Sequence, residues 1–120
     1  MRAVHDVIAS VCRMPSEFHR RRDVSILRLA EDSDYRAHQT TIGVEDFQQY
    51  LQAHPELVGE WYVYSDNKRT SSGWYFDHAA RRVGYYSGSR REREQTFDDV
   101  TQACAAFIKH EIDSIIDHAA

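Results

Sequence analysis

The sequence predicts an α+β domain with N-terminal helices, a small antiparallel sheet of about two to three strands and a long C-terminal helix. Three observations predict it: apolar residues at helical spacing in the first half, short aromatic runs of strand composition, and a final apolar stripe at helical spacing. A small hairpin is unstable alone, so a helix face must bury it. The 120 residues, 42% hydrophobic and 28% charged, fit one domain over residues 1–120.

Helices are expected over residues 3–13, 24–32 and 44–53. The first ends at Met14 and Pro15, because proline disfavours helical geometry in the residue before it. A short turn follows from Ser16, and residues 19–22 are expected to form a basic linker. Thr41 is expected to lie at the start of the third helix.

Residues 57–65 have two interpretations. Pro55 suits the first turn of a helix, and Leu57, Trp61 and Tyr64 recur at helical spacing. The run at residues 61–64 nevertheless has strand composition. We expect a helix here, with a strand as the alternative.

Strands are expected at residues 74–76 and 83–86, around a turn at residues 78–81. A charged loop over residues 87–95 and a helix over residues 97–119 should complete the domain. Cys12 and Cys104 both lie in expected helices, so we expect two buried free thiols.

Charge is unevenly spread along the chain, whose formal net charge is −4. Residues 31–60 hold seven acids and one base, whereas residues 61–93 hold seven bases and three acids. Such a dipolar surface could steer a charged partner, or it could simply be solvated.

Aromatic residues concentrate in residues 61–86, which contain eight of the fourteen in the chain. Tyrosine and tryptophan dominate binding hot spots, but in strands about half of such residues must face the core. His110, Asp113 and Asp117 have the spacing of a metal-binding helix face, yet we expect a solvated face instead.

Several function classes are disfavoured. The sequence contains no GxSxG, P-loop, GxGxxG or CxxC motif, so we expect neither enzymatic activity nor a cofactor. A catalytic site that has no sequence motif and is assembled in three dimensions stays an alternative. Nucleic acid is disfavoured because residues 44–53, the segment that would read DNA, carry acids and no base. No apolar run is long enough for a membrane span, and we expect a cytoplasmic protein without a membrane partner.

Two segments together resemble small bacterial immunity proteins of polymorphic-toxin and contact-dependent inhibition systems. The first runs from Val44-Glu45-Asp46-Phe47 through Pro55-Glu56-Leu57, Trp61 and Tyr64-Ser65-Asp66-Asn67-Lys68-Arg69 to Gly73-Trp74-Tyr75-Phe76. The second joins Val83-Gly84-Tyr85-Tyr86 and Phe97 to Ala103-Cys104-Ala105-Ala106-Phe107-Ile108. The resemblance covers about two thirds of the chain, from residue 44 onward, and implies a non-enzymatic binder that occludes a toxin domain.

The acidic segment would then face a basic toxin domain, and the aromatic loop at residues 61–75 would supply the anchors. The alternative is a small regulatory or ligand-binding domain with an aromatic-lined pocket. The residues expected to bind the protein partner are Glu31, Asp32, Asp34, Glu45, Asp46, Trp61, Asp66, Lys68, Arg69, Trp74 and Tyr75.

Overall fold

Six α-helices and a three-stranded antiparallel sheet make up the computed structural model, which describes residues 3–21, 23–68 and 70–118. The predicted α+β class is confirmed, including the long C-terminal helix. In chain order the elements are α1 (Val4–Cys12), α2 (Met14–Arg20), α3 (Ile26–Asp32), the 3-10 helix η1 (Tyr35–His38), α4 (Val44–Ala53), α5 (Glu56–Asp66), β1 (Ser72–Asp77), β2 (Arg82–Ser87), β3 (Arg90–Thr96) and α6 (Val100–His118).

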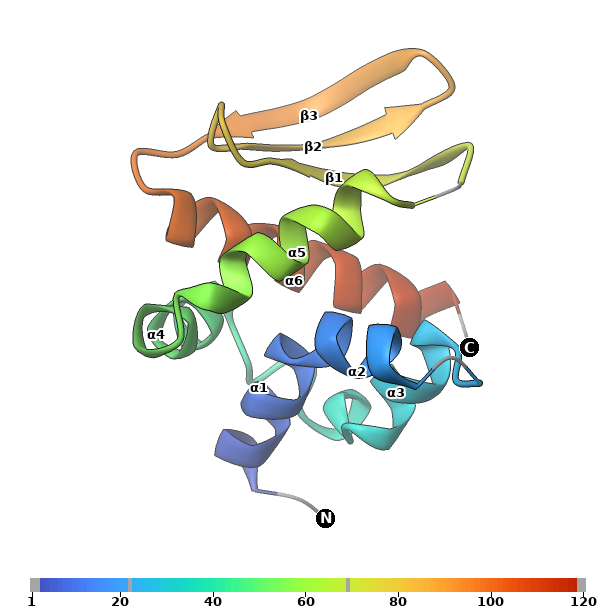
Figure 1. Cartoon of the computed structure of the whole chain (residues 1–120), viewed down its shortest axis with the longest axis vertical. Coiled ribbons are helices and arrows are strands. Elements are labelled where there is room, and N and C mark those ends of the chain that lie inside the picture. Colours follow the sequence, from blue (N-terminus) through green and yellow to red (C-terminus); the bar gives the residue numbers. More distant parts are fainter. Residues whose placement is uncertain (1–2, 22, 69, 119–120) are drawn as a thin grey trace.

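α6 lies between two layers of the molecule: the sheet and the group of helices α1 to α4 (Figure 1). Figure 1 shows the sheet on one side of α5 and α6, and α1 to α4 on the other. α6 packs against α1, α3, α4, α5, β1 and β2. Its buried Phe107 ring meets the rings of Trp61, Tyr64 and Phe76, so one core joins the sheet to the helices.

The sheet has the order β1-β2-β3, and both pairs are antiparallel. Phe76 on β1 pairs with Val83 on β2, and both side chains are buried. The charged loop predicted at residues 87–95 is wrong, because β3 occupies most of it and pairs with β2. β3 is an edge strand with mostly exposed side chains, so it needs no apolar alternation, and its charges discourage pairing with other chains.

The predicted end of the first helix is nearly correct, since α1 ends at Cys12 and the break lies at Arg13, but the segment after it is more helical than expected. α2 already begins at Met14, with Pro15 in its first turn, where its missing N–H costs no hydrogen bond. Buried Met14 fixes this turn in the core, and the helix extends to Arg20, through the first half of the predicted basic linker. Arg22 lies outside the described residues.

Other boundaries differ from prediction for local reasons. α4 has its predicted bounds, but the residue that caps its start is Gly43 and not Thr41, because the Asp46 carboxylate accepts a hydrogen bond of 2.8 Å from the Gly43 backbone N–H. α3 starts after Ser25, whose hydroxyl accepts from the Arg28 N–H. α6 starts at Val100, three residues later than predicted.

Residues 57–65 are helical, within α5, as expected. Cys12 and Cys104 are buried free thiols, also as expected. Within the described ranges, no helix has the length and apolar character needed to cross a membrane.

Candidate binding groove

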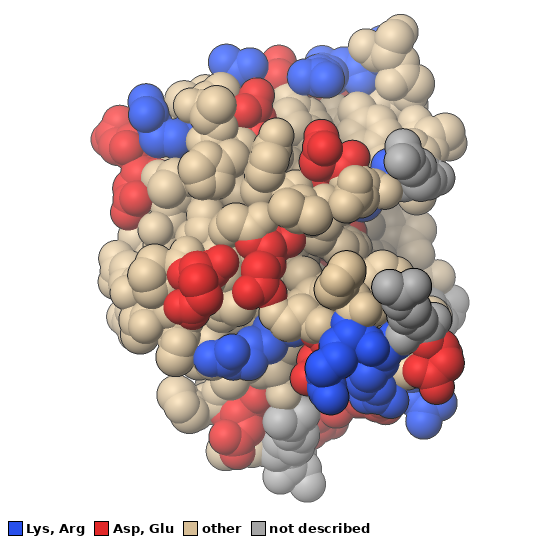
Figure 2. All heavy atoms as spheres, in the orientation of Figure 1, with Lys and Arg blue, Asp and Glu red and all other residues tan. Residues whose placement is uncertain are grey.

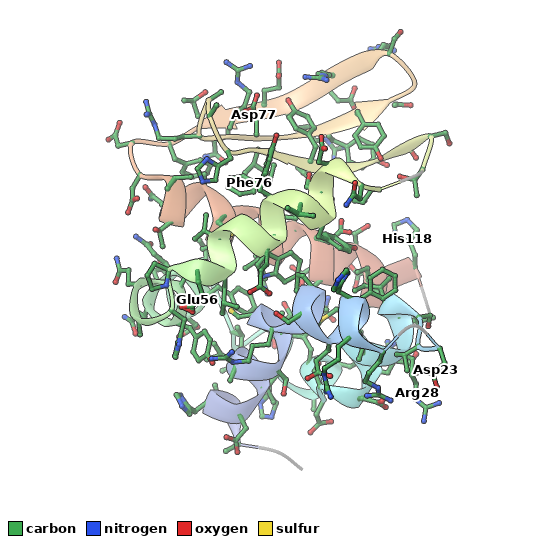
Figure 3. The ribbon with its side chains drawn as sticks, viewed as in Figure 1. Asp23, Arg28, Glu56, Phe76, Asp77 and His118 are labelled. Atoms are coloured by element: carbon green, nitrogen blue, oxygen red, sulfur yellow. The ribbon has the colours of Figure 1, made fainter. Side chains whose placement is uncertain are left out.

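An open groove of about 1420 Å³ lies between α2, α5 and the C-terminal half of α6. The segment before β1 and the side chain of Tyr85 on β2 extend its lining. Glu56 and His118 both line the groove, and Figure 3 places them well apart across the molecule, so the groove is elongated. In Figure 2 the surface is recessed on the right, between the sheet layer and the N-terminal helices.

Two large apolar side chains on the groove lining are exposed to solvent. Val63 on α5 is 55% exposed and Phe18 on α2 is 42% exposed. Ile26 and Ile115 add half-buried apolar surface to the same lining. A concave apolar surface of this kind is typical of a site of association.

A buried polar cluster lies on the floor of the groove. The Lys68 Nζ lies 3.0 Å from Glu111 Oε1 and donates a second hydrogen bond of 3.0 Å to the Trp74 carbonyl. The Tyr64 hydroxyl donates to Glu111 Oε2 at 2.6 Å. The Lys68 and Glu111 side chains are only 12% and 7% exposed, so the pair is largely desolvated. It fastens the segment before β1 to α6.

Burial, together with the adjacent Glu111 carboxylate, raises the pKa of Tyr64 well above its ordinary value. Its hydroxyl therefore stays protonated and acts as a hydrogen-bond donor. The side chains of the floor thus form hydrogen bonds and an ion pair with one another, and this arrangement stabilises the fold.

The N-terminal half of α5 forms an acidic wall of the groove. Glu56 and Glu60 lie one helical turn apart, and Gly59 lies beside them. The Ser16 hydroxyl of α2 donates a hydrogen bond to the Glu60 carboxylate. Glu56 is exposed, and Glu60 is half-buried.

The acidic residues expected to form one partner-binding surface are dispersed over the molecule. Glu31 and Asp32 lie on α3, Asp34 immediately precedes η1, and Glu45 and Asp46 lie on α4. α3 and α4 lie on opposite sides of the view in Figure 1, and Figure 2 shows acids and bases interspersed over this face. Asp32 pairs with Arg28, and Asp46 caps its own helix. These acids therefore come from separate elements, and their role in partner binding stays a prediction.

The expected aromatic anchors also separate. Trp61 is 1% exposed, and its Nε1 donates to the Cys12 carbonyl at 2.9 Å, so its predicted role as a surface anchor is wrong. Trp74 faces α6, where it stacks on His110 at 3.9 Å. Tyr75 lies over Gly84, and its hydroxyl donates to Glu94 at 2.6 Å.

Among the remaining predicted residues, Lys68 alone lines the groove. Asp66 is exposed at the end of α5, and Arg69 lies outside the described residues. The groove instead uses Phe18, Glu56 and Val63, which were not predicted. Val63 carries a faint sequence signal, because it is an apolar residue off the buried stripe of its helix.

The expected solvated face at His110, Asp113 and Asp117 is wrong in part. His110 is half-buried against Trp74, and Asp113 accepts a hydrogen bond of 2.5 Å from the Tyr35 hydroxyl and pairs with Lys109. Only Asp117 is exposed. The described part of the chain contains no cluster of three or more His, Cys, Asp or Glu residues that could hold a metal ion.

Comparisons of the chain with protein-family models, with curated proteins and with solved structures found no match.

Proposed function

We propose that this protein is a non-enzymatic, protein-binding domain of the immunity type, which captures a toxin domain and blocks it. The observation that carries the proposal is the groove between α2, α5 and α6. Its volume of about 1420 Å³ exceeds the roughly 300–1,000 Å³ that is usual for small-molecule sites. A segment of another protein would fill it better than a metabolite would.

The apolar lining supplies the driving force for such capture. Val63 and Phe18 expose apolar surface that water must solvate in the free protein. Burying a side chain of this size in an interface contributes at most about 1.5–3 kcal/mol to the free energy of binding. Two such anchors on the lining of one groove could form the centre of a specific interface.

Growth rescue tests the proposal. The product of the gene next to this one is induced in a bacterial host, with and without this protein, and colony survival is counted. We expect survival only when this protein is present and forms a complex with that product. Survival that does not depend on this protein, or the absence of a complex, would exclude the immunity role.

Val63→Glu tests whether the groove is the surface used. It places a charge on the apolar wall at an exposed helical position, so the fold should tolerate it. We expect binding to weaken by about 2 kcal/mol, or roughly thirtyfold. Gln52→Glu adds the same charge at an exposed position of α4, outside the groove, and should change affinity little.

One observation favours a second candidate, a small regulatory or ligand-binding domain. Tyr64, Lys68 and Glu111 converge on the floor beneath apolar walls, as polar groups do in many ligand sites. A thermal-shift panel of metabolites tests it, because a ligand at 100 times its Kd raises stability by about 2.7 kcal/mol. No stabilisation across the panel would count against this candidate and leave the first in place.

A further inference from the structure

Gly59 lies in the interior of α5, on the wall of the groove. Glycine at such a position costs roughly 0.5–1 kcal/mol relative to alanine. Apart from Gly59 itself, its chain neighbours and the nearby backbone of α5, no described atom lies within 4 Å of the position that a Cβ would take, and the backbone there is ordinary helix. Neither packing nor backbone conformation within the described chain therefore requires glycine. Its missing side chain leaves room for another backbone to approach α5.

Glu56 and Glu60 present like charges at a spacing of four residues on the same helix. Such a pair destabilises a helix by roughly 0.2–0.5 kcal/mol. Neither carboxylate forms an ion pair within the described residues, whereas Glu111 on the groove floor is paired with Lys68. This part of the wall therefore keeps uncompensated negative charge, which a cation seated between the two glutamates would neutralise.

The apolar part of the lining begins three residues further along α5. Val63 follows Glu60 on the groove side of the helix, and Phe18 of α2 lines the groove as well. From the N-terminal end of α5 onward, the wall thus presents an acid, an open glycine, a second acid and an exposed valine. This order complements a helix that carries a base about one turn from its apolar side chains.

We propose that the groove receives a basic amphipathic helix of the partner protein. Its backbone passes closely over Gly59, a Lys or Arg lies between Glu56 and Glu60, and its apolar side chains cover Val63 and Phe18. Elongated grooves walled by helices accept a further helix through anchors spaced three, four and seven residues apart. The inference rests on the proposed function for the existence of a partner, and it adds the chemistry of the segment that binds.

Fluorescence anisotropy with two designed peptides tests the charge requirement on the full chain. Both are labelled amphipathic helices of about 18 residues with the same leucine face, one with lysine and one with glutamate on the polar face. We expect the lysine peptide to bind at least about tenfold more tightly, by an amount that falls with added salt. Equal affinities for the two peptides would overturn the proposal.

Paired substitutions locate the charge effect. Glu56→Gln with Glu60→Gln should weaken binding of the lysine peptide about tenfold, since both unpaired carboxylates are lost. The matched control is Glu31→Gln with Glu45→Gln, which removes two exposed acids outside the groove. An equal loss of affinity in both double variants would mean that the net charge of the protein alone attracts the lysine peptide. That result would overturn the proposed site.

Gly59→Ala separates close approach from charge. The substitution should raise the melting temperature of the free protein and yet weaken binding of the lysine peptide about tenfold. Unchanged affinity would overturn the close approach over α5. Sedimentation equilibrium gives a further check, because a dimer that Val63→Glu dissociates would mean that a second copy of the chain fills the groove.

The growth assay distinguishes this inference from the proposed function. If the wild type rescues growth and the Glu56/Glu60 and Gly59 variants rescue it equally well, the inference fails while the immunity role stands. If the lysine peptide binds as expected but no toxin is neutralised, the immunity role fails while the helix-binding groove stands.

Discussion

Replacing Lys68 with methionine should destabilise the protein strongly, because it leaves the Glu111 carboxylate buried without its counter-charge. Breaking a buried ion pair from one side costs about 3–5 kcal/mol. The side chains are 12% and 7% exposed on the groove floor, so water relieves part of this cost. The Tyr64 hydrogen bond to Glu111 remains, whereas the bond from Lys68 to the Trp74 carbonyl is lost. We expect a loss of about 3 kcal/mol, a large part of the roughly 5–15 kcal/mol that stabilises a typical domain.

Urea unfolding followed by circular dichroism measures this loss. With a slope of about 2 kcal/mol per molar, the midpoint should fall by roughly 1.5 M. Adding Glu111→Gln to Lys68→Met removes the stranded charge, while the amide oxygen still accepts from Tyr64, so we expect about half of the loss to be recovered. Arg28→Met is the matched control, because its pair with Asp32 is exposed by 69% and 49% and should contribute less than about 1 kcal/mol. Equal losses in Lys68→Met and Arg28→Met would refute the argument from burial.

Three further predictions concern single groups. Burial lowers the pKa of His110 below its ordinary value of 6.5, so the unfolded state binds protons first, and the free energy of unfolding should fall as pH drops below about 6.5 toward the folded-state pKa. Gly84→Ala would place a Cβ 2.7 Å from the Tyr75 hydroxyl oxygen and 2.8 Å from ring carbons, and displacing the ring should lower stability by about 1–2 kcal/mol in thermal unfolding. Burial raises the pKa of Cys12 to about 12 and that of Cys104 well above its ordinary value, so neither thiol should react with a disulfide reagent until denaturant is added.

Each of these has a clear contrary result. His110→Gln should flatten the acid limb of the stability curve, and an unchanged slope would assign the proton uptake to other groups. An unaltered melting temperature for Gly84→Ala would mean that Tyr75 moves without cost. Stoichiometric thiol labelling of the native protein would show that the helices around Cys12 and Cys104 open readily.

Local signals in the sequence predicted much of the fold. Residues 44–53 are bounded as expected, because the apolar spacing of Phe47 and Leu51 and the acids of the first turn all favour one helix. Pro55 and the stripe through Trp61 decided in favour of the α5 helix over a strand. β3 was not predicted, because it is a charged edge strand without apolar periodicity. Backbone hydrogen bonds to β2 hold it in the sheet.

The candidate site was largely beyond prediction. Phe18 and Val63 are remote in sequence, and only the packing of α2 beside α5 brings them to one groove. Composition indicated an acidic segment correctly, but it could not reveal that α3 and α4 lie on opposite sides of the molecule. Of the described acids in that segment, only Glu56 and Glu60 line the groove.

The position of α6 between the two layers has a consequence for synthesis in the cell. Translation runs from the N-terminus, so α1 to α5 and the sheet emerge from the ribosome before α6 exists. Until Phe107 and the neighbouring turns of α6 arrive, both layers expose the apolar faces that they later bury on it. The nascent chain therefore exposes an incomplete core to chaperones, and these elements fold as a unit only once α6 has left the ribosome.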